Sequence, residues 1–427
     1  MQLPEEFITY TKSLFGEERW QRYLSAFDAM PPVSIRINPF KTPLAMPIMD
    51  ETEVTAVTWC RNAYYLAERP NFTLDPLLHA GAYYVQEASS MFLDTVMQQF
   101  LPDTPITMLD LCAAPGGKST LLRSALPEGS LLFTNEPDRR RANILMENMQ
   151  KQGHPDVIVT NNFPRDYKKA GILFDAILCD VPCSGEGMFR KDEGAIGEWS
   201  LQNVMKCQEL QRSIIEDIWP CLREGGLMVY STCTFNTREN EENVKWIMES
   251  LGAEILEVSI SDEWNITGSL LEGWRAPVYR FIPGTTCGEG LFMAVLRKTD
   301  DSVGKQVAMT KALSQLRILS DGHPVGIKKG KDIIPAHAES LLVNIGITSK
   351  LINREKAYRD LAFPMVELSL TDAQRYLHHE ALVLPPDTPR GFVVVTYQNL
   401  PLGFVKNIGN RANNLYPQEW KIRNLAG

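Results

Sequence analysis

The spacing of apolar residues changes from helical to strand-like near the start of the chain. Apolar side chains recur at every third or fourth position between residues 5 and 27, which predicts an amphipathic helix. Pro31 and Pro32 end this pattern, and the alternation in Val33-Ser34-Ile35-Arg36-Ile37 predicts a strand. We therefore expect the N-terminal part to mix helix and strand.

Beyond residue 105, short apolar runs alternate with helical stretches. The runs predict strands at 106–111, 131–133, 157–159, 174–179 and 227–230. Helices are predicted near 119–125, 138–152 and 203–222. Such alternation is typical of a doubly wound, mostly parallel α/β sheet that binds its ligands at the carboxyl ends of the strands.

Two changes in pattern suggest domain boundaries. A break lies near Pro102–Pro105, before the first apolar run, and the polar stretch 299–304 is typical of a linker. The last third contains short β-rich runs at 391–397 and 403–405, which favour a small β-containing domain. We therefore predict three domains, at residues 1–105, 106–300 and 301–427.

Length and composition narrow the class of protein. The chain has 427 residues, of which 44% are hydrophobic and 22% charged, so it is too long for one ordinary domain and is typical of a globular protein. No run approaches the roughly 20 apolar residues of a membrane-spanning helix, so no membrane partner is expected. The acidic N-terminus has no apolar core of a secretory signal. Eight cysteines without dense regular spacing fit reduced thiols, and hence a cytoplasmic protein.

The net charge of −9 argues against a nucleic-acid partner only when it is taken for the whole chain. Residues 1–105 carry −6, residues 106–300 carry −8, and residues 301–427 carry +5. The basic last third indicates either a surface that holds RNA or a solvated face that balances an acidic body. Its final residues include Lys406, Arg411, Lys421 and Arg423 against Glu419 alone.

A glycine-rich loop, Asp110-Leu111-Cys112-Ala113-Ala114-Pro115-Gly116-Gly117-Lys118-Ser119-Thr120, follows the first strand of the predicted sheet. It is not a P-loop, because Cys112 stands where that motif needs glycine, and G-x-G-x-x-G is also absent. After the second strand, Glu136 is placed to accept the hydroxyls of a ribose. The pattern favours an adenosine ligand without a pyrophosphate, for which S-adenosyl-L-methionine is the obvious candidate. The alternative is a tight turn beside a surface glutamate.

Two cysteines follow two strands of the same predicted sheet. Cys183 stands in Asp180-Val181-Pro182-Cys183 after strand 174–179, and Cys233 follows strand 227–230. Both thiols should therefore lie at the ligand-binding edge. The other cysteines outside the loop are interpreted as small buried apolar residues: Cys60, Cys179, Cys207, Cys221 and Cys287.

Two thiols and an aspartate suit methylation at carbon 5 of cytosine. This carbon is too weak a nucleophile to take a methyl group from a sulfonium unless a thiolate first adds to carbon 6 and a proton is supplied at N3. After the transfer, the carbon-5 proton must leave and the thiolate must be expelled, so a second acid or base is useful. Asp180, Cys183 and Cys233 can supply these roles. The chain lacks the four closely spaced ligands of a zinc site, so no metal is expected.

The motifs resemble those of the Nop/Sun family of RNA 5-cytosine methyltransferases, and within it the F type of bacterial small-subunit ribosomal RNA methyltransferases. The resemblance covers essentially the whole chain. It rests on DLCAAPGGKST at 110–120, DVPCSGEGMFRKD at 180–192 and YSTCTFNTRENEENV at 230–244, with SIRIN at 34–38 and HAGAYYVQEASSMF at 79–92 before them. Residues from about 340 onward resemble the C-terminal RNA-binding module of the family, through the stretches 358–382 and 391–417.

The resemblance implies a fold and a set of cofactor residues. The fold would be α/β, a Rossmann-like class I methyltransferase sheet with a small N-terminal α+β substrate-binding domain and a C-terminal, PUA-like RNA-binding module. Glu136 would hold the ribose of S-adenosyl-L-methionine. Asn162 would stand near the adenine, where many members have an acid; Asn161 and Asp166 are the alternatives. The loop residues implied to hold the cofactor are Cys112, Ala113, Ala114, Pro115, Gly116, Gly117 and Lys118, with Lys118 near its carboxylate.

The resemblance also assigns the thiols. Cys233 would be the nucleophile and Cys183 would help to release the product, although DNA 5-cytosine methyltransferases use the Pro-Cys thiol as nucleophile and spacing does not decide between the two. Asp180 would contact the target base or the methionyl end of the cofactor. In the C-terminal module, the aromatic residues among the basic ones favour contact with RNA, with the core of a small β domain as the alternative: Tyr397, Phe404 and Tyr416.

The implied function is S-adenosylmethionine-dependent RNA (cytosine-5) methylation through a covalent cysteine–cytosine intermediate. The implied partner is small-subunit ribosomal RNA, either free or within the ribosomal subunit. Two alternatives stay open: a non-catalytic RNA-binding or ribosome-assembly factor on a methyltransferase scaffold, and a small-molecule methyltransferase. The latter would leave the N-terminal and basic C-terminal segments without a role.

Overall fold

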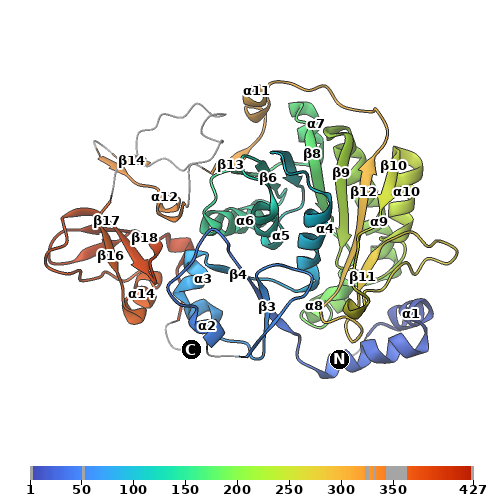
Figure 1. The fold of residues 1–427 in the computed structure, drawn as a ribbon, viewed down its shortest axis with the longest axis horizontal. Coiled ribbons are helices and arrows are strands. Elements are labelled where there is room, and N and C mark those ends of the chain that lie inside the picture. The colour runs from blue at the N-terminus through green and yellow to red at the C-terminus, as the bar shows by residue number, and fades with distance from the viewer. Residues whose placement is uncertain (1–2, 51–52, 323–326, 330–331, 343–362, 425–427) are drawn as a thin grey trace.

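A computed structural model describes residues 3–50, 53–322, 327–329, 332–342 and 363–424 (Figure 1). The N-terminal part confirms the predicted helix and strand, with a kink in the helix at Gly16. Its sheet is antiparallel in the order β2-β3-β1-β4. The elements are α1 (Glu5–Ser25), η1 (Ala26–Asp28), β1 (Val33–Ile37), α2 (Pro47–Asp50), β2 (Val54–Ala56), β3 (Ala63–Leu66), η2 (Phe72–Leu74), α3 (Pro76–Ala80), β4 (Tyr83–Val85), η3 (Ser89–Phe92) and α4 (Leu93–Phe100).

The central sheet has the order β10-β12-β9-β8-β5-β6-β7-β13, with β11 paired to β12. Its five middle strands are parallel, as the alternating pattern predicts. These strands are β5 (Thr107–Asp110), β6 (Leu131–Asn135), β7 (Val157–Thr160), β8 (Phe174–Asp180) and β9 (Leu222–Thr232). Antiparallel strands extend both edges, so the sheet is mixed: β10 (Ala253–Leu256), β11 (Tyr279–Phe281), β12 (Leu291–Lys298) and β13 (Ile318–Ser320).

Helices cover both faces of this sheet, because successive residues of each strand point to opposite sides. Met108 faces a core with α4 (Leu93–Phe100), α5 (Gly117–Ala125) and α6 (Arg139–Gln152). Leu109 faces the other core. The helices and turns on that side and in the connections are α7 (Pro164–Ala170), η4 (Glu186–Met188), α8 (Glu193–Glu198), α9 (Leu201–Ile218), η5 (Trp219–Cys221), α10 (Glu241–Leu251) and η6 (Asp262–Trp264).

The C-terminal module is a second small sheet, in the order β16-β17-β18-β19, that lies beside α3 (Figure 1). Gln374 Nε2 donates to the carbonyl oxygen of Leu74 at 3.0 Å, and one apolar cluster includes residues of both parts, such as Leu77 and Tyr376. The module is thereby fixed to the N-terminal part. The elements after the central sheet are α11 (Met309–Leu313), β14 (Ile327–Lys329), β15 (Asp332–Ile334), α12 (His337–Leu341), β16 (Met365–Glu367), α14 (Leu370–Leu377), β17 (Gly391–Tyr397), β18 (Leu400–Asn407), β19 (Ala412–Asn414) and η7 (Gln418–Trp420).

The aromatic residues of this module form its core. Tyr397, Phe404 and Tyr416 are 8%, 1% and 2% exposed, so the interpretation of Tyr416 as an RNA-facing side chain is wrong. A four-stranded sheet with one short helix needs large apolar side chains to build a core, and these residues supply them. The basic residues of the same segment are exposed: Lys406, Arg411, Lys421 and Arg423. Residues 343–362, where the resemblance to the family module begins, lie outside the described residues.

Candidate active site

The loop after β5 is held in place by bonds to β6 and α6. Ala113 N donates to Asn135 O at 2.8 Å, and Arg141 Nη2 donates to Ala114 O at 2.9 Å. Gly116 has φ +117°, a conformation that favours glycine, and a Cβ there would lie 3.3 Å from Leu145 Cδ1. The backbone of the loop is thus fixed where α5 begins.

The side chain of Cys112 does not line the candidate site. It packs against the core behind the sheet, and burial raises the pKa of its thiol well above the usual value. Beneath the loop, burial also raises the pKa of Asp110 to about 7, while Ser119 Oγ donates to its carboxylate at 2.6 Å. Cys112 therefore contributes through its backbone, and Asp110 stabilises the start of α5 from below.

Glu136 directly follows β6 and keeps one acceptor oxygen available. Its Oε1 accepts from Asp138 N at 3.0 Å, and Arg141 Nη1 lies 3.3 Å from its Oε2. Oε2 is buried, yet it accepts no hydrogen bond from any described residue. Burial raises the pKa of this carboxyl group. A buried oxygen at the end of the second strand that makes an ion pair with Arg141, but no hydrogen bond with the described residues, fits a ligand hydroxyl.

The asparagines after β7 are already engaged. Asn162 Oδ1 accepts from Arg317 N at 3.0 Å, and its Nδ2 donates to Arg317 O at 3.2 Å. Asn161 Nδ2 donates to the carbonyl oxygens of Glu136 and Pro137, both at 2.8 Å. Both amides thus join this loop to neighbouring backbone.

The two candidate cysteines meet because β8 and β9 are neighbouring parallel strands. The register places Asp180 opposite Ser231, so the loops that follow leave the sheet side by side. Cys183 Sγ and Cys233 Sγ lie 3.3 Å apart. Gly187 N donates to Cys233 O at 2.8 Å, and a Cβ on Gly187 would lie 2.9 Å from that oxygen. Only glycine permits this approach of the two loops.

Asp180 joins the loop after β5 to the end of β9, close to the thiol pair. Its Oδ2 accepts from Lys118 Nζ at 2.9 Å, and its Oδ1 accepts from Ser231 Oγ at 2.6 Å. Burial acts to lower the pKa of Lys118, but the charge and hydrogen bond of Asp180 outweigh it and leave the pKa raised, with a further contribution from Cys233. A stable ammonium therefore lies within electrostatic reach of Cys233.

Cys183 holds its proton more firmly than an ordinary thiol. Its hydrogen bond with Cys233, then burial, then the charges of Cys233 and Glu239 raise its pKa well above the usual value. The structure therefore brings together Lys118, Asp180, Cys183 and Cys233 from three loops at the carboxyl edge of the sheet.

The remaining cysteines lie elsewhere. Cys60, Cys179 and Cys221 are buried in the apolar cores, and burial raises the pKa of the Cys60 and Cys221 thiols to about 12. Cys207 is only half-buried and Cys287 is exposed, so the interpretation as a buried residue is wrong for Cys287. Cys179 lies four positions before Cys183, but its side chain is fully buried in the core behind the sheet. No group of three or more His, Cys, Asp or Glu residues that could hold a metal ion occurs in the part of the chain that the structure describes. No helix among the residues described combines the length and apolar character needed to cross a bilayer.

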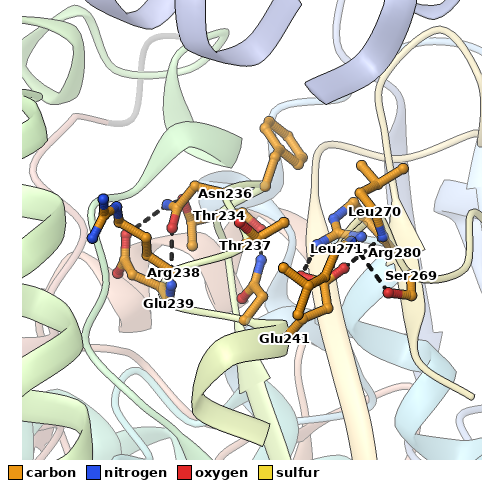
Figure 2. A network of polar contacts seen from close by, with 12 residues as sticks. Thr234, Asn236, Thr237, Arg238, Glu239, Glu241, Ser269, Leu270, Leu271 and Arg280 are labelled. Atoms are coloured by element: carbon orange, nitrogen blue, oxygen red, sulfur yellow. Dashed lines mark hydrogen bonds and ion pairs between the residues drawn. The ribbon is translucent and has the colours of Figure 1, made fainter. Parts of the chain in front are cut away.

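Sequence reasoning overlooked the polar network behind the thiols. Asn236 and Glu239 lie next to one another in the segment that follows Cys233 (Figure 2). Glu186 extends the network from the loop of Cys183, and Gln211 extends it from α9. The sequence does show an acidic residue shortly after each cysteine, Glu186 after Cys183 and Glu239 after Cys233. Both of these acids are buried.

Comparisons with known proteins decide the family. Residues 97–297 match 16S rRNA methyltransferase RsmB/F, residues 3–88 match the N-terminal domain of 16S rRNA methyltransferase RsmF, and residues 363–422 match the methyltransferase RsmF PUA domain. Ribosomal RNA small subunit methyltransferase F of Salmonella agona is 30% identical over 97% of this chain and 96% of its own length. The chain belongs to the 16S rRNA methyltransferase RsmB/F family. Its namesake in Citrobacter koseri is 29% identical over the same shares of both chains.

Solved structures agree on the fold. NSun6 from Pyrococcus horikoshii, solved with SFG, has a TM-score of 0.59 at 21% identity, covering 70% of this chain and 99% of that chain. A methyltransferase homologue from the same organism has a TM-score of 0.57 at 24% identity, covering 69% and 100%. As a member of the RsmB/F family, the protein is an S-adenosylmethionine-dependent RNA methyltransferase with an N-terminal α+β domain and a C-terminal PUA domain. The fold class inferred from the sequence is confirmed.

Replacing Glu136 by alanine is expected to weaken binding of S-adenosyl-L-methionine by about tenfold to a hundredfold, because hydrogen bonds to a charged acceptor contribute roughly 1.5–3 kcal/mol. Isothermal titration without RNA measures this directly. Glu147→Gln is the matched control, because Glu147 pairs with Lys151 on the same side of the sheet, near the other end of α6. Equal affinities for the Glu136 variant and the unaltered protein would contradict the assignment.

Proposed function

We propose that the protein methylates carbon 5 of a cytosine in small-subunit ribosomal RNA, with Cys233 as the nucleophile and Cys183 as the acid/base that completes the reaction. The observation that carries the proposal is the pair of thiols 3.3 Å apart beside the Lys118–Asp180 ion pair. An amine methyltransferase or a non-catalytic RNA-binding protein has no need for two thiols in this position.

The proposed reaction begins at Cys233. Its sulfur adds to carbon 6 of the cytosine while a proton reaches N3, which makes carbon 5 nucleophilic. Lys118 stabilises the thiolate, and Asp180 orients the base from between Lys118 and Ser231. S-adenosyl-L-methionine, when bound, supplies an activated methyl group to carbon 5. Once the Cys183 thiol, which lies against Cys233, has given its own proton to solvent, its sulfur takes the proton from carbon 5, the bond between Cys233 and carbon 6 breaks, and N3 releases the proton that it gained.

The positions of the loop after β5, of Glu136 and of Asn162 suggest how the cofactor is held. The backbone of the loop from Cys112 to Lys118 faces the methionyl end, and Glu136 Oε2 accepts from the ribose. The amide of Asn162 is occupied by Arg317, so we propose that Asn162 acts near the adenine by fixing its loop rather than by offering its side chain.

We propose that RNA enters through a groove of about 790 Å³ between the N-terminal sheet and the loop that follows Cys183. The groove is lined by the basic side chains Arg69 and Lys191, by the acidic side chains Glu68 and Glu87, and by Gln86 and Ser34. We propose that the two basic side chains meet phosphates and that the uncharged lining accepts a base that has left its stack. We also propose three domains, at residues 1–105, 106–300 and 301–427. Strand β13 belongs to the last of these and pairs with the central sheet of the second. We propose a cytoplasmic location because the proposed substrate is ribosomal RNA.

The test is to incubate the protein and labelled S-adenosyl-L-methionine with ribosomal RNA and with small subunits from cells that lack the gene. Label at carbon 5 of one cytosine is expected, and the comparison of the two substrates shows whether free RNA or the particle is used. Absence of carbon-5 label on both substrates would refute the proposal. Mapping 5-methylcytosine with and without the gene identifies the position.

Charge reversal in the C-terminal tail is expected to weaken RNA binding. Lys421→Glu together with Arg423→Glu should reduce affinity by roughly tenfold or more and lower the slope of log K against log salt by about 1 to 2, because both exposed side chains are proposed to contact phosphates. Filter binding at several salt concentrations gives both values. Lys245→Glu on α10, which covers another face of the sheet, is the control. An unchanged salt slope would exclude the tail from the interface.

A further inference from the structure

Two buried carboxylates connect the loops that carry the thiols. Glu186 lies three positions after Cys183, and Glu239 lies six positions after Cys233. They are 1% and 0% exposed. Neither has a role in the steps proposed for methylation. Burying two carboxylates costs free energy unless each is well hydrogen-bonded, so the hydrogen bonds that these two accept should indicate what they do.

Each carboxylate binds the backbone beside the other loop's cysteine. Glu239 Oε2 accepts from Ser184 N at 3.0 Å, directly after Cys183. Glu186 Oε2 accepts from Phe235 N at 2.6 Å and from Asn236 N at 3.0 Å, shortly after Cys233. The bonds therefore cross between the loops in both directions.

Asn236 joins the two carboxylates to each other. Its Nδ2 lies 3.1 Å from Glu186 Oε1 and 2.8 Å from Glu239 Oε1, and Figure 2 shows its amide directed toward Glu239. Trp199 Nε1 donates to Glu186 at 2.9 Å, and Gln211 Nε2 donates to Glu239 at 2.7 Å. Both acids are thus surrounded by N–H donors on well-packed elements. Burial, and then the charge of Glu186, raise the pKa of Glu239 to about 7.

We propose that the Glu186–Asn236–Glu239 cluster positions the two thiols, setting the separation at which Cys183 can act on the adduct that Cys233 forms. The three side chains are buried, so they act through the thiols as positioning residues. The roles of the thiols rest on the proposed function, whereas the effect of the cluster on their separation does not.

Glutamine at position 186 or 239 tests the proposal with little change in volume. In either variant an NH₂ group replaces one acceptor oxygen and must face N–H donors, two of which belong to backbone in the case of Glu186. The loops should then move apart. A shift of about 1 Å in a reacting group can cost a hundredfold in rate, so kcat is expected to fall by roughly tenfold to a hundredfold. The KM for RNA should stay within about threefold, because the groove is not altered.

Disulfide formation reports the separation of the thiols without any need for activity. Diamide takes up the two thiol hydrogens and two electrons at its N=N bond, and the sulfurs of Cys183 and Cys233 become joined. At 3.3 Å the thiols need little movement to reach a bond of about 2.05 Å, so the unaltered protein should be cross-linked rapidly. Glu186→Gln and Glu239→Gln should be cross-linked at least about tenfold more slowly. Peptide mass spectrometry identifies the pair and its rate.

Thr237→Val is the matched control, because Thr237 lies in the same segment (Figure 2) but its hydroxyl contacts Tyr10 of α1. It should be cross-linked at the rate of the unaltered protein. Affinity for S-adenosyl-L-methionine shows whether a glutamine variant is folded. If neither is, Gln211→Met decides, because it removes the amide that bonds both Glu239 and the carbonyl oxygen of Pro182, directly before Cys183, and it should slow cross-linking about threefold or more. Unchanged cross-linking in folded variants would overturn the proposal, whatever the RNA assay shows.

Discussion

Cys233→Ala is expected to lower the rate of methyl transfer to RNA by at least about a thousandfold, since removal of a covalent nucleophile leaves only the contribution of binding. The side chain projects from the carboxyl end of β9, where Lys118 and Asp180 face the same space. Without the sulfur, carbon 5 of cytosine is not activated. Binding of cofactor and RNA should remain within about threefold of the unaltered protein. Transfer of labelled methyl groups to ribosomal RNA measures the rate.

Cys287→Ala is the control for this substitution. Cys287 is an exposed thiol remote in sequence from both motifs, and its backbone oxygen accepts a hydrogen bond from Tyr65. Its replacement should leave the rate unchanged. A Cys233 variant that retains more than about a tenth of the activity would exclude it as the nucleophile and direct attention to Cys183.

The sequence predicts the places of the candidate residues at the ends of strands because each of these places depends on a local pattern. Glu136, Cys183 and Cys233 each follow a strand with a clear apolar pattern, and the carboxyl ends of parallel strands lie at one edge of a sheet. The meeting of the thiols then depends only on β8 and β9 being neighbours. The pattern does not give that strand order, yet it is the order that sets the distance of 3.3 Å.

Features that depend on distant segments escaped prediction. The side chain of Asn162 bonds the backbone of Arg317, 155 positions later, because β13 returns to pair with β7. No local pattern announces such a pairing. Tyr416 was misjudged for the same reason, since its burial depends on Tyr376 and on His79 of the N-terminal part. Mixed aromatic and basic residues are compatible with an RNA surface and equally with a core whose basic neighbours point outward.

The buried acids show a third kind of difficulty. Glu186 and Glu239 stand in polar stretches, and a glutamate in such a stretch is usually exposed. Their burial is possible because backbone N–H groups, Asn236 and Gln211 meet them, and those donors come from both cysteine loops and from α9. Sequence reveals the acids, whereas only the folded chain reveals their donors.

Cys183→Ala is expected to trap the enzyme on its substrate. The first steps need Cys233 alone, so RNA should still become attached and methylated. The carbon-5 proton then lacks the base that lies against Cys233 in the unaltered protein, and expulsion of the Cys233 sulfur stalls. Turnover should fall by about a hundredfold or more. Denaturing gels should show a protein–RNA band that accounts for most of the enzyme and that disappears on nuclease treatment.

The double variant Cys183→Ala, Cys233→Ala serves as the control and should give no such band, because the covalent bond requires the Cys233 sulfur. The pair of single variants also separates the two possible assignments, since only the variant that keeps its nucleophile and loses the second thiol can hold methylated RNA. A band with Cys233→Ala and none with Cys183→Ala would reverse the roles. The contact of 3.3 Å between the two sulfurs makes this comparison sharp, because whichever thiol forms the bond to carbon 6, the other lies close enough to act on the adduct.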